Sequence, residues 1–471
     1  MPEIPVTLIK GDKVSSLVDY RDALPVNMYA IEKEILGAKG YMQSYPGLTS
    51  FGTSLGVDRG ANYNERFKNH FRVSGTHLIS VSTLGVVTDL GDIPGVSQCR
   101  LQNFYSFNTQ GIIADGKMFL YDAVGGFREV VDADLGSPID GVWIDGYYFL
   151  TDGEYLYHTD IDDEESIDPL KYATAEFMPD LSLGLAKTKD NKVMVFGRYT
   201  IEYFVNVASE NFAFQRLSTR AQKIGIVATH AKCEVKGVFY ITGGHKEEAI
   251  SVYVLSGGVS VKISTKEIDK ILAKYTEPKL VDMRMETYTE NGMTFILIHL
   301  PEEVLCFNET ISKTIGLFYA WSILKSDTIG DNPYRAINGI FDARNSLWIY
   351  GDKLDENLGK LDESVVTHYN EKIEWILFTP FLNLNEISID KIEIVIVPGF
   401  NIIDDATVAI SLTTNGLTYG AEYWLKYSEP LDYNKRFIIR RIGYVRNYVG
   451  FKFRGISTSK MAFGLMKVEY S

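Results

Sequence analysis

Short runs of β-forming residues, separated by glycine-containing turns, fill the middle of this 471-residue chain. Asp-Gly between two apolar runs is a strong signal for a tight β-hairpin, because both residues tolerate the positive φ angles that such a turn needs. The chain has three such pairs: Asp115-Gly116, Asp145-Gly146 and Asp152-Gly153. The 29 Tyr, 25 Phe and 40 Gly agree with many short strands joined by turns. We therefore predict an all-β chain.

The strand-like units recur roughly every 30–55 residues between about Asn62 and Leu361, close to the ~40–50-residue period of propeller blades. No repeated sequence motif marks these units, so their spacing predicts a β-propeller-like domain without fixing the number of blades. The clearest hairpin joins Lys192–Phe196 (KVMVF) and Thr200–Val205 (TIEYFV). Its apolar residues alternate with period two, which predicts strands that are buried on one face.

We expect three parts: an N-terminal arm (1–60), the propeller-like domain (61–361) and a C-terminal β-sandwich (362–471) that packs with the arm as a platform. Apolar spacing predicts one helix from Lys266 to about Tyr275, ended by Pro278, as an insertion near 266–277 between blades. Longer strands are predicted in the last part, at Glu393–Val397, Val408–Thr413, Phe437–Ile442, Val449–Ile456 and Phe463–Val468.

Motifs for catalysis or metal binding are weak. The three cysteines and seven histidines show no metal-ligand spacing, and neither GxSxG nor a phosphate-binding loop occurs. The acidic loop from Asp160 to Asp168 begins like a calcium loop, but Glu165 and Lys171 stand where an EF-hand needs Gly and Glu. We expect no enzyme, cofactor or metal site. A basic-apolar leader and a membrane-length apolar run are both missing, so we expect synthesis in a cytoplasm.

Charge is distributed unevenly along the chain. Residues 426–467 hold ten Lys or Arg and two acids, a local net charge of +8. Because the whole chain has a net charge of −14, the remainder carries −22. Between Phe451 and Arg454 the aromatic and basic residues alternate, which places them on opposite faces of a strand. The basic face is predicted to meet an acidic protein surface, or alternatively DNA phosphate. Its residues are Lys435, Arg436, Arg440, Arg441, Arg446, Lys452 and Arg454.

Several short sequence motifs resemble those of the packaged-DNA stabilization (tail hub or nozzle) family of P22-like short-tailed bacteriophages. The run from Tyr20 to Gly47 contains LPVNM, KEIL, GY and PG in the family's order. Tyr157–Phe204 is similar to the family's acidic loop and hairpin, and IDKILAKYT with ILIHLPEEVL to its helical insertion. Ile410–Phe453 contains LTTNGLTYG, YNKR and GFK. The resemblance covers most of the chain and is weak at 62–140.

This resemblance implies a virion structural protein of the phage tail, made in the host cytoplasm. It implies a homohexameric ring below the portal-adaptor (head-to-tail connector) protein. The ring would extend the channel for double-stranded DNA, stabilise packaged DNA and take part in genome ejection, and it would carry tail spikes or fibres and a tail needle or plug. Lys435, Arg436, Arg440 and Arg441 are then expected to face the adaptor. The arm residues Leu24, Pro25, Asn27 and Met28 are expected to anchor the arm in the same platform.

Two alternatives stay open at this point. A propeller can also be a carbohydrate-binding or glycosidase tail protein, which would need a pocket of aromatic residues and carboxylates and would bind or cleave a polysaccharide. An unrelated cytosolic propeller scaffold is the third possibility, and it gives no reason for the LPVNM…KEIL run. A negatively charged channel wall would suit a DNA conduit, because it repels phosphate.

Overall fold

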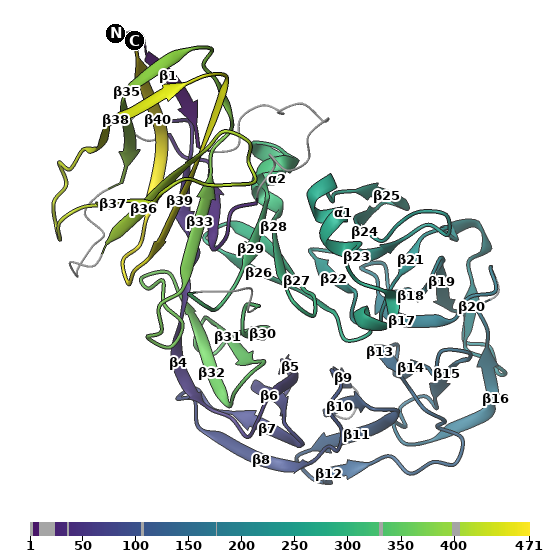
Figure 1. Ribbon diagram of the computed structural model, residues 1–471. Coiled ribbons are helices and arrows are strands. Elements are labelled where there is room, and N and C mark those ends of the chain that lie inside the picture. Colours follow the sequence, from purple (N-terminus) through teal and green to yellow (C-terminus); the bar gives the residue numbers. More distant parts are fainter. Residues whose placement is uncertain are drawn as a thin grey trace.

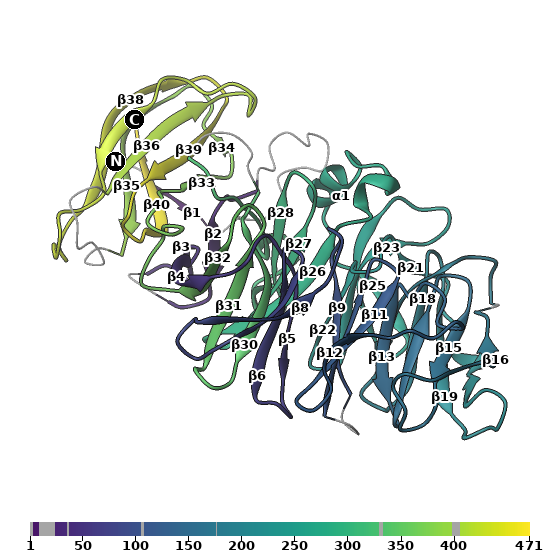
Figure 2. The same ribbon diagram turned by 90° about the horizontal axis from the view of Figure 1, so that it is seen from below.

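The computed structural model describes residues 3–8, 24–34, 37–104, 108–175, 177–328, 333–397 and 406–471. Strands dominate these ranges and form a β-propeller with a β-sandwich beside it (Figure 1). Figure 2 shows the blades from another side, with the sandwich projecting past one edge of the propeller. The predicted all-β class is confirmed. No described helix is long and apolar enough to span a membrane.

Seven sheets make up the propeller in the described part of the chain. Blade 1 is β5 (Asp58–Asn64), β6 (Asn69–Ser74), β7 (His77–Val81) and β8 (Val87–Asp92); blade 2 is β9 (Arg100–Phe104), β10 (Thr109–Ala114), β11 (Lys117–Asp122) and β12 (Gly126–Glu129); blade 3 is β13 (Asp140–Ile144), β14 (Tyr147–Thr151), β15 (Leu156–Thr159) and β16 (Ile167–Ala173); blade 4 is β17 (Ser182–Lys187), β18 (Val193–Gly197), β19 (Ile201–Asn206) and β20 (Phe214–Arg216).

The last three blades are less regular. Blade 5 is β21 (Gly225–Ile226), β22 (Lys232–Val235), β23 (Val238–Gly244), β24 (Ser251–Ser256) and β25 (Val259–Lys262); blade 6 is β26 (Arg284–Glu290), β27 (Met293–His299), β28 (Val304–Asn308) and β29 (Trp321–Leu324); blade 7 is β30 (Ala336–Asp342), β31 (Leu347–Asp352), β32 (Asn357–Asp362) and β4 (Gly47–Thr53).

The ring of blades is closed by a strand from the N-terminal region. β4 pairs antiparallel with β32, from Gly47 opposite Asp362 to Thr53 opposite Asn357, and so completes blade 7. The inner strand of that blade, β30, contacts β5 of blade 1 on one side and β26 of blade 6 on the other. The expected arm of residues 1–60 is therefore divided, because β4 and the start of β5 belong to the propeller.

Strand β18 of blade 4 is buried on both faces, which corrects the expectation that this strand is half-buried. All five residues of β18 are buried. Val193 and Val195 pack into the cluster shared with blade 3, whereas Met194 and Phe196 join the core shared with blade 5. The period-two pattern fails to separate inside from outside here, because each face of a blade packs on a neighbouring blade.

Two of the three predicted Asp-Gly hairpins form as expected, and the predicted helix forms but ends at Leu272, before the expected end near Tyr275. Asp115 and Asp145 adopt positive φ angles of 47° and 51° in two-residue hairpins. At the third pair, Asp152 instead accepts hydrogen bonds from the backbone of Glu154 and Tyr155 in a longer turn. Helix α1 (Lys266–Leu272) lies between blades 5 and 6. The helices that the sequence did not reveal are α2 (Glu309–Thr314), η2 (Ser218–Arg220), η3 (Glu277–Leu280) and η4 (Leu317–Tyr319).

The sandwich combines C-terminal and N-terminal strands, as predicted. Its first sheet has the order β2-β3-β40-β35-β38 with β1 on β40, and its second has the order β33-β39-β36-β37 with β34 on β39. The first contains β1 (Glu3–Thr7), β2 (Met28–Ile31), β3 (Tyr41–Ser44), β35 (Ile387–Ile396), β38 (Phe437–Val445) and β40 (Ala462–Tyr470); the second contains β33 (Glu374–Phe378), β34 (Leu382–Asn383), β36 (Thr407–Thr413), β37 (Tyr423–Lys426) and β39 (Tyr448–Ile456).

Asn27 ties the two domains together. Residues 25–27 run between β29 of the propeller and β33 of the sandwich, and Val26 exchanges two backbone hydrogen bonds with Ile376 of β33. The Asn27 amide donates to the backbone carbonyls of Lys325 (2.9 Å) and Glu374 (2.7 Å), and its oxygen accepts from the Lys325 backbone N–H at 3.0 Å. Asn27 is 2% exposed and has a φ of 51°, an angle that Asn tolerates well.

His368 lies in the segment that leads from blade 7 into the sandwich. Its backbone forms bridges with Leu48 and Glu371, and its Nδ1 lies 2.8 Å from the hydroxyl of Ser326. The ring makes an edge contact with Tyr334 at 5.2 Å and is buried. Burial, with the nearby Arg335 charge as a smaller cause, lowers the pKa of His368 to about 3.

Replacing Asn27 with Ala should remove three hydrogen bonds to buried backbone groups of Lys325 and Glu374. We expect the variant to lose about 2–4 kcal/mol of unfolding free energy relative to a matched control. The control is Asn291→Ala, because Asn291 has a similar φ of 48° but is exposed in a turn. Urea denaturation of the two variants measures the difference. Equal losses would show that Asn27 contributes only its backbone conformation.

Replacing His368 with Gln should reduce the loss of stability in acid. Because the folded pKa of His368 is below the ~6.5 of an unfolded chain, its stabilising contribution is complete above that pH and is lost as the pH falls toward 3. Between pH 7.5 and 5.0 the wild type should lose about 2 kcal/mol more than the variant. Urea titrations at the two pH values test this, and parallel pH dependences would contradict it.

Candidate docking surfaces

The seven basic residues predicted as an interface do not form one continuous face. Lys435, Arg436, Arg440 and Arg441 lie just before or within β38 in the first sheet, and Arg446 follows in the turn to β39. Lys452 and Arg454 lie on β39, which belongs to the second sheet. The structure therefore divides them between the two layers of the sandwich.

Three of the seven are held by other residues of the same chain. Arg436 makes a two-pronged ion pair with Glu393 at 2.7 and 2.6 Å, and these hydrogen bonds lower the pKa of Glu393. Arg454 pairs with Glu422 at 2.5 and 2.8 Å and with Glu374 at 3.1 Å. Lys452 lies over the ring of Tyr419, 4.7 Å from its centre. These contacts occupy their charges within the sandwich.

The other four, Lys435, Arg440, Arg441 and Arg446, have no ion pair with any carboxylate in the described part of the chain; we call them the free basic cluster. Arg440, Arg441 and Arg446 are exposed, and Lys435 is half-buried. β38 is an edge strand of the first sheet. Its pairing with β35 is interrupted at Arg441, whose φ is +60°. Such a bulge, together with edge charges, discourages pairing with another strand through the backbone.

Aromatic residues beside the cluster behave in two ways. Phe437, Phe451 and Phe453 are 1–2% exposed and belong to the sandwich core, as the alternating pattern predicted. Tyr444 on β38 is instead 62% exposed and lies outside the core. Tyr423 and Trp424 of the edge strand β37 are more than half exposed as well. Trp424 lies against the guanidinium of Arg454, 5.4 Å from its ring centre, whereas Tyr423 lines a hollow with Arg440 and Arg441. An exposed aromatic residue next to free arginines is typical of protein interfaces.

The arm residues named by the sequence lie at the domain junction. Leu24, Asn27 and Met28 are buried inside this chain, and Pro25 accepts a hydrogen bond from the backbone of Ile323. Met28 begins β2 in the first sheet of the sandwich. They anchor the arm between the sandwich and blade 6. A role of these four residues toward a neighbouring subunit or adaptor stays a prediction.

The structure assigns neither a metal ion to the acidic loop nor a sugar to the alternative carbohydrate site. Lys171 pairs with Asp160 at 2.7 Å, and the described residues hold no group of three or more His, Cys, Asp or Glu that could bind a metal. A recess of about 320 Å³ at blade 3 does contain Tyr155, Tyr172 and Asp side chains. It has the residue types that a sugar site needs, so the carbohydrate alternative stays a prediction.

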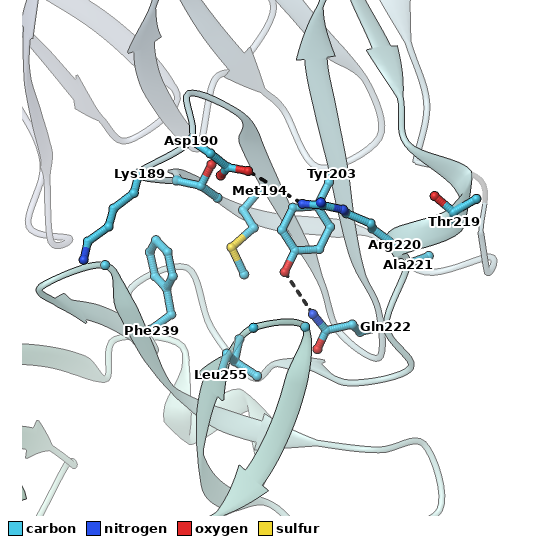
Figure 3. A pocket seen from close by; sticks show the side chains of 14 residues that line it. Lys189, Asp190, Met194, Tyr203, Thr219, Arg220, Ala221, Gln222, Phe239 and Leu255 are labelled. Atoms are coloured by element: carbon cyan, nitrogen blue, oxygen red, sulfur yellow. Dashed lines mark hydrogen bonds and ion pairs between the residues drawn. The ribbon is translucent and has the colours of Figure 1, made fainter.

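Sequence reasoning missed a larger recess between blades 4 and 5, with a volume of about 550 Å³ (Figure 3). Its walls come from β18, β19, β23 and β24 and from the turns that join these strands to their neighbours. The lining residues are spread over about 70 positions, from Thr188 to Gly258. No local pattern in the sequence could have brought them together, because their meeting depends on how the two blades pack.

Comparison with known proteins gives consistent results over the whole chain. A family model described as "Bacteriophage P22 Gp10, beta-propeller" matches residues 3–366, and "Bacteriophage P22 Gp10, beta-sandwich" matches residues 374–471. "Tail hub protein gp10" of Salmonella phage P22 is 30% identical over 98% of both chains. The predicted propeller and sandwich are thus confirmed by an independent route.

Solved structures with a similar arrangement are more distant. They include a streptogramin B lyase (11% identity, 67% of this chain and 97% of that one, TM-score 0.43) and a virginiamycin B lyase from Staphylococcus aureus (9%, 65% and 94%, TM-score 0.41). These likenesses carry no functional weight at such scores. The two family matches and the full-length relative agree with each other, and the chain therefore belongs to the bacteriophage P22 Gp10 family and is a P22-like tail hub protein.

Proposed function

We propose that this tail hub protein forms a homohexameric ring below the portal-adaptor protein of a short-tailed phage. The ring extends the channel for double-stranded DNA, stabilises the packaged DNA and takes part in genome ejection. It also carries tail spikes or fibres and a tail needle or plug. The chain is made in the host cytoplasm and acts in the virion tail, and its mechanism is steric. Membership of the P22 Gp10 family supports this proposal.

The free basic cluster is the observation that favours attachment through the sandwich. It lies on the outer strand β38, at the end of the molecule away from blades 2 to 4 (Figure 1). Its charges are available to a partner, because no described carboxylate of the chain pairs with them. The remainder of the chain is strongly acidic, so either the adaptor or a neighbouring hub subunit with a similar acidic surface fits these cations.

Contact with DNA is less well supported than contact with protein. DNA in the channel would pass without sequence recognition, and a wall of net negative charge limits adhesion to phosphate. Three of the seven predicted basic residues are already engaged within the sandwich. Four cations remain, and so small a number suits a local protein contact better than a track for a long polyanion.

Cryo-electron microscopy of adaptor-portal complexes mixed with this protein tests the ring directly. We expect six copies coaxial with the portal, around a lumen of roughly 20 Å or more, which is wide enough for a B-DNA duplex to pass. The sandwich should face the adaptor. Copies that bind away from the portal axis, or a single copy at the tip of a fibre, would refute the hub ring.

The double variant Arg440→Glu/Arg441→Glu should block attachment to adaptor-bearing heads while the fold is preserved. Both side chains are exposed and have no ion pair in the described structure, so reversal of their charge costs little stability. Lys246→Glu/Lys279→Glu is the matched control, because it makes the same charge change at exposed propeller positions. Co-sedimentation with heads measures attachment. Normal attachment of the first variant would remove the free basic cluster from the interface.

A further inference from the structure

The recess between blades 4 and 5 has an apolar floor contributed by both blades. Met194 of β18, Phe239 of β23 and Leu255 of β24 line it, and all three are labelled in Figure 3. They are 2–6% exposed. Gly257 and Gly258, in the turn after β24, also line the recess and have no neighbouring atoms where a Cβ would be. The volume of about 550 Å³ leaves room for one large apolar side chain and its flanking backbone.

The rim carries two cations and one carboxylate: Lys189, Arg220 and Asp190. Asp190 is already engaged, because it pairs with Lys192 and lies 3.6 Å from Arg220, whose side chain is 58% exposed. Lys189 has no ion pair in the described part of the chain. The lining residues therefore have a net charge of +1, which favours an anionic ligand.

Tyr203 adds a directed hydrogen-bond donor. Its hydroxyl accepts a hydrogen bond from the side-chain amide of Gln222 at 2.9 Å, as the dashed line in Figure 3 shows. A tyrosine hydroxyl can accept and donate at the same time. Because Gln222 supplies the donor in that contact, the proton of the hydroxyl is left to point toward an acceptor in the recess. A carboxylate bound beside Tyr203 would receive it.

We propose that this recess binds an extended segment of another virion protein that carries a carboxylate next to a large apolar side chain. The apolar side chain enters above Met194, Phe239 and Leu255, while the carboxylate meets Tyr203 and the cationic rim. The side chain of Lys189 packs directly over Gly237. A Cβ at position 237 would lie only 1.9 Å from the Cε of Lys189, so this path to the mouth of the recess requires glycine. A nucleic acid fits less well, since only two cations, Lys189 and Arg220, line the recess, and a phosphate chain is held by several. The site is separate from the free basic cluster and does not depend on the ring.

The test uses the full-length protein and three short probes, acetyl-Glu-Phe-Glu-amide, acetyl-Lys-Phe-Lys-amide and acetyl-Glu-Gly-Glu-amide. We expect the first to bind with a Kd of about 1 mM or tighter in an NMR titration, and the other two to bind at least about fivefold more weakly. Absence of binding by the first probe, or equal binding of all three, would overturn the proposal. Equal competition by a short single-stranded DNA would reassign the recess to nucleic acid and also overturn it.

Three variants locate the binding. Lys189→Glu should weaken the first probe by about fivefold or more through loss of attraction and new repulsion, and Ala221→Trp should abolish binding by filling the recess. Lys246→Glu is the control, because it makes the same charge change in the turn at the opposite end of β23 and should leave the affinity within about twofold. Circular dichroism confirms that each variant is folded. Unchanged binding in both recess variants would place the probe elsewhere and refute the proposal.

Discussion

The pairing of β4 with β32 is the contact on which the architecture depends. It closes the propeller, because without β4 the seventh blade lacks its outer strand. The antiparallel register also places the start of β4 beside the end of β32. The chain before residue 47 and the chain after residue 362 consequently leave the propeller at the same place. Both then enter one sandwich, where β1 to β3 join β35, β38 and β40.

That convergence explains why the domain junction is so well connected. A single linker would allow the sandwich to swing, but here two segments of the chain cross between the domains. Asn27, in the N-terminal segment, forms three hydrogen bonds, with Lys325 on the propeller side and Glu374 on the sandwich side. Lys325 of the propeller side and Glu374 of the sandwich side also form an ion pair at 2.6 Å beneath it. These contacts make the junction stiff, whereas relative movement of domains is otherwise the usual expectation.

Local pairing also decides which charges are available to partners. Seven basic residues looked equivalent in the sequence, yet Arg436 and Arg454 are neutralised by Glu393, Glu422 and Glu374 on neighbouring strands. These acids are 32 to 80 positions away along the chain, so no charge pattern within one segment could reveal them. The same applies to the blade 4–blade 5 recess, whose apolar lining from β18, β23 and β24 gathers only when two blades pack against each other.

The sequence by itself determined the all-β class, the Asp-Gly hairpins at 115 and 145, the helix at 266 and the joining of both chain ends in a sandwich. These follow from turn chemistry, apolar spacing and family-specific words, which are local. Tertiary structure alone decided the seven blades, the transfer of β4 and the start of β5 to the propeller, and the burial of β18 on both faces. It also decided which arginines are free. Each of these depends on which strands and charges distant in sequence become neighbours, and the alternation of apolar residues along one strand carries no record of that.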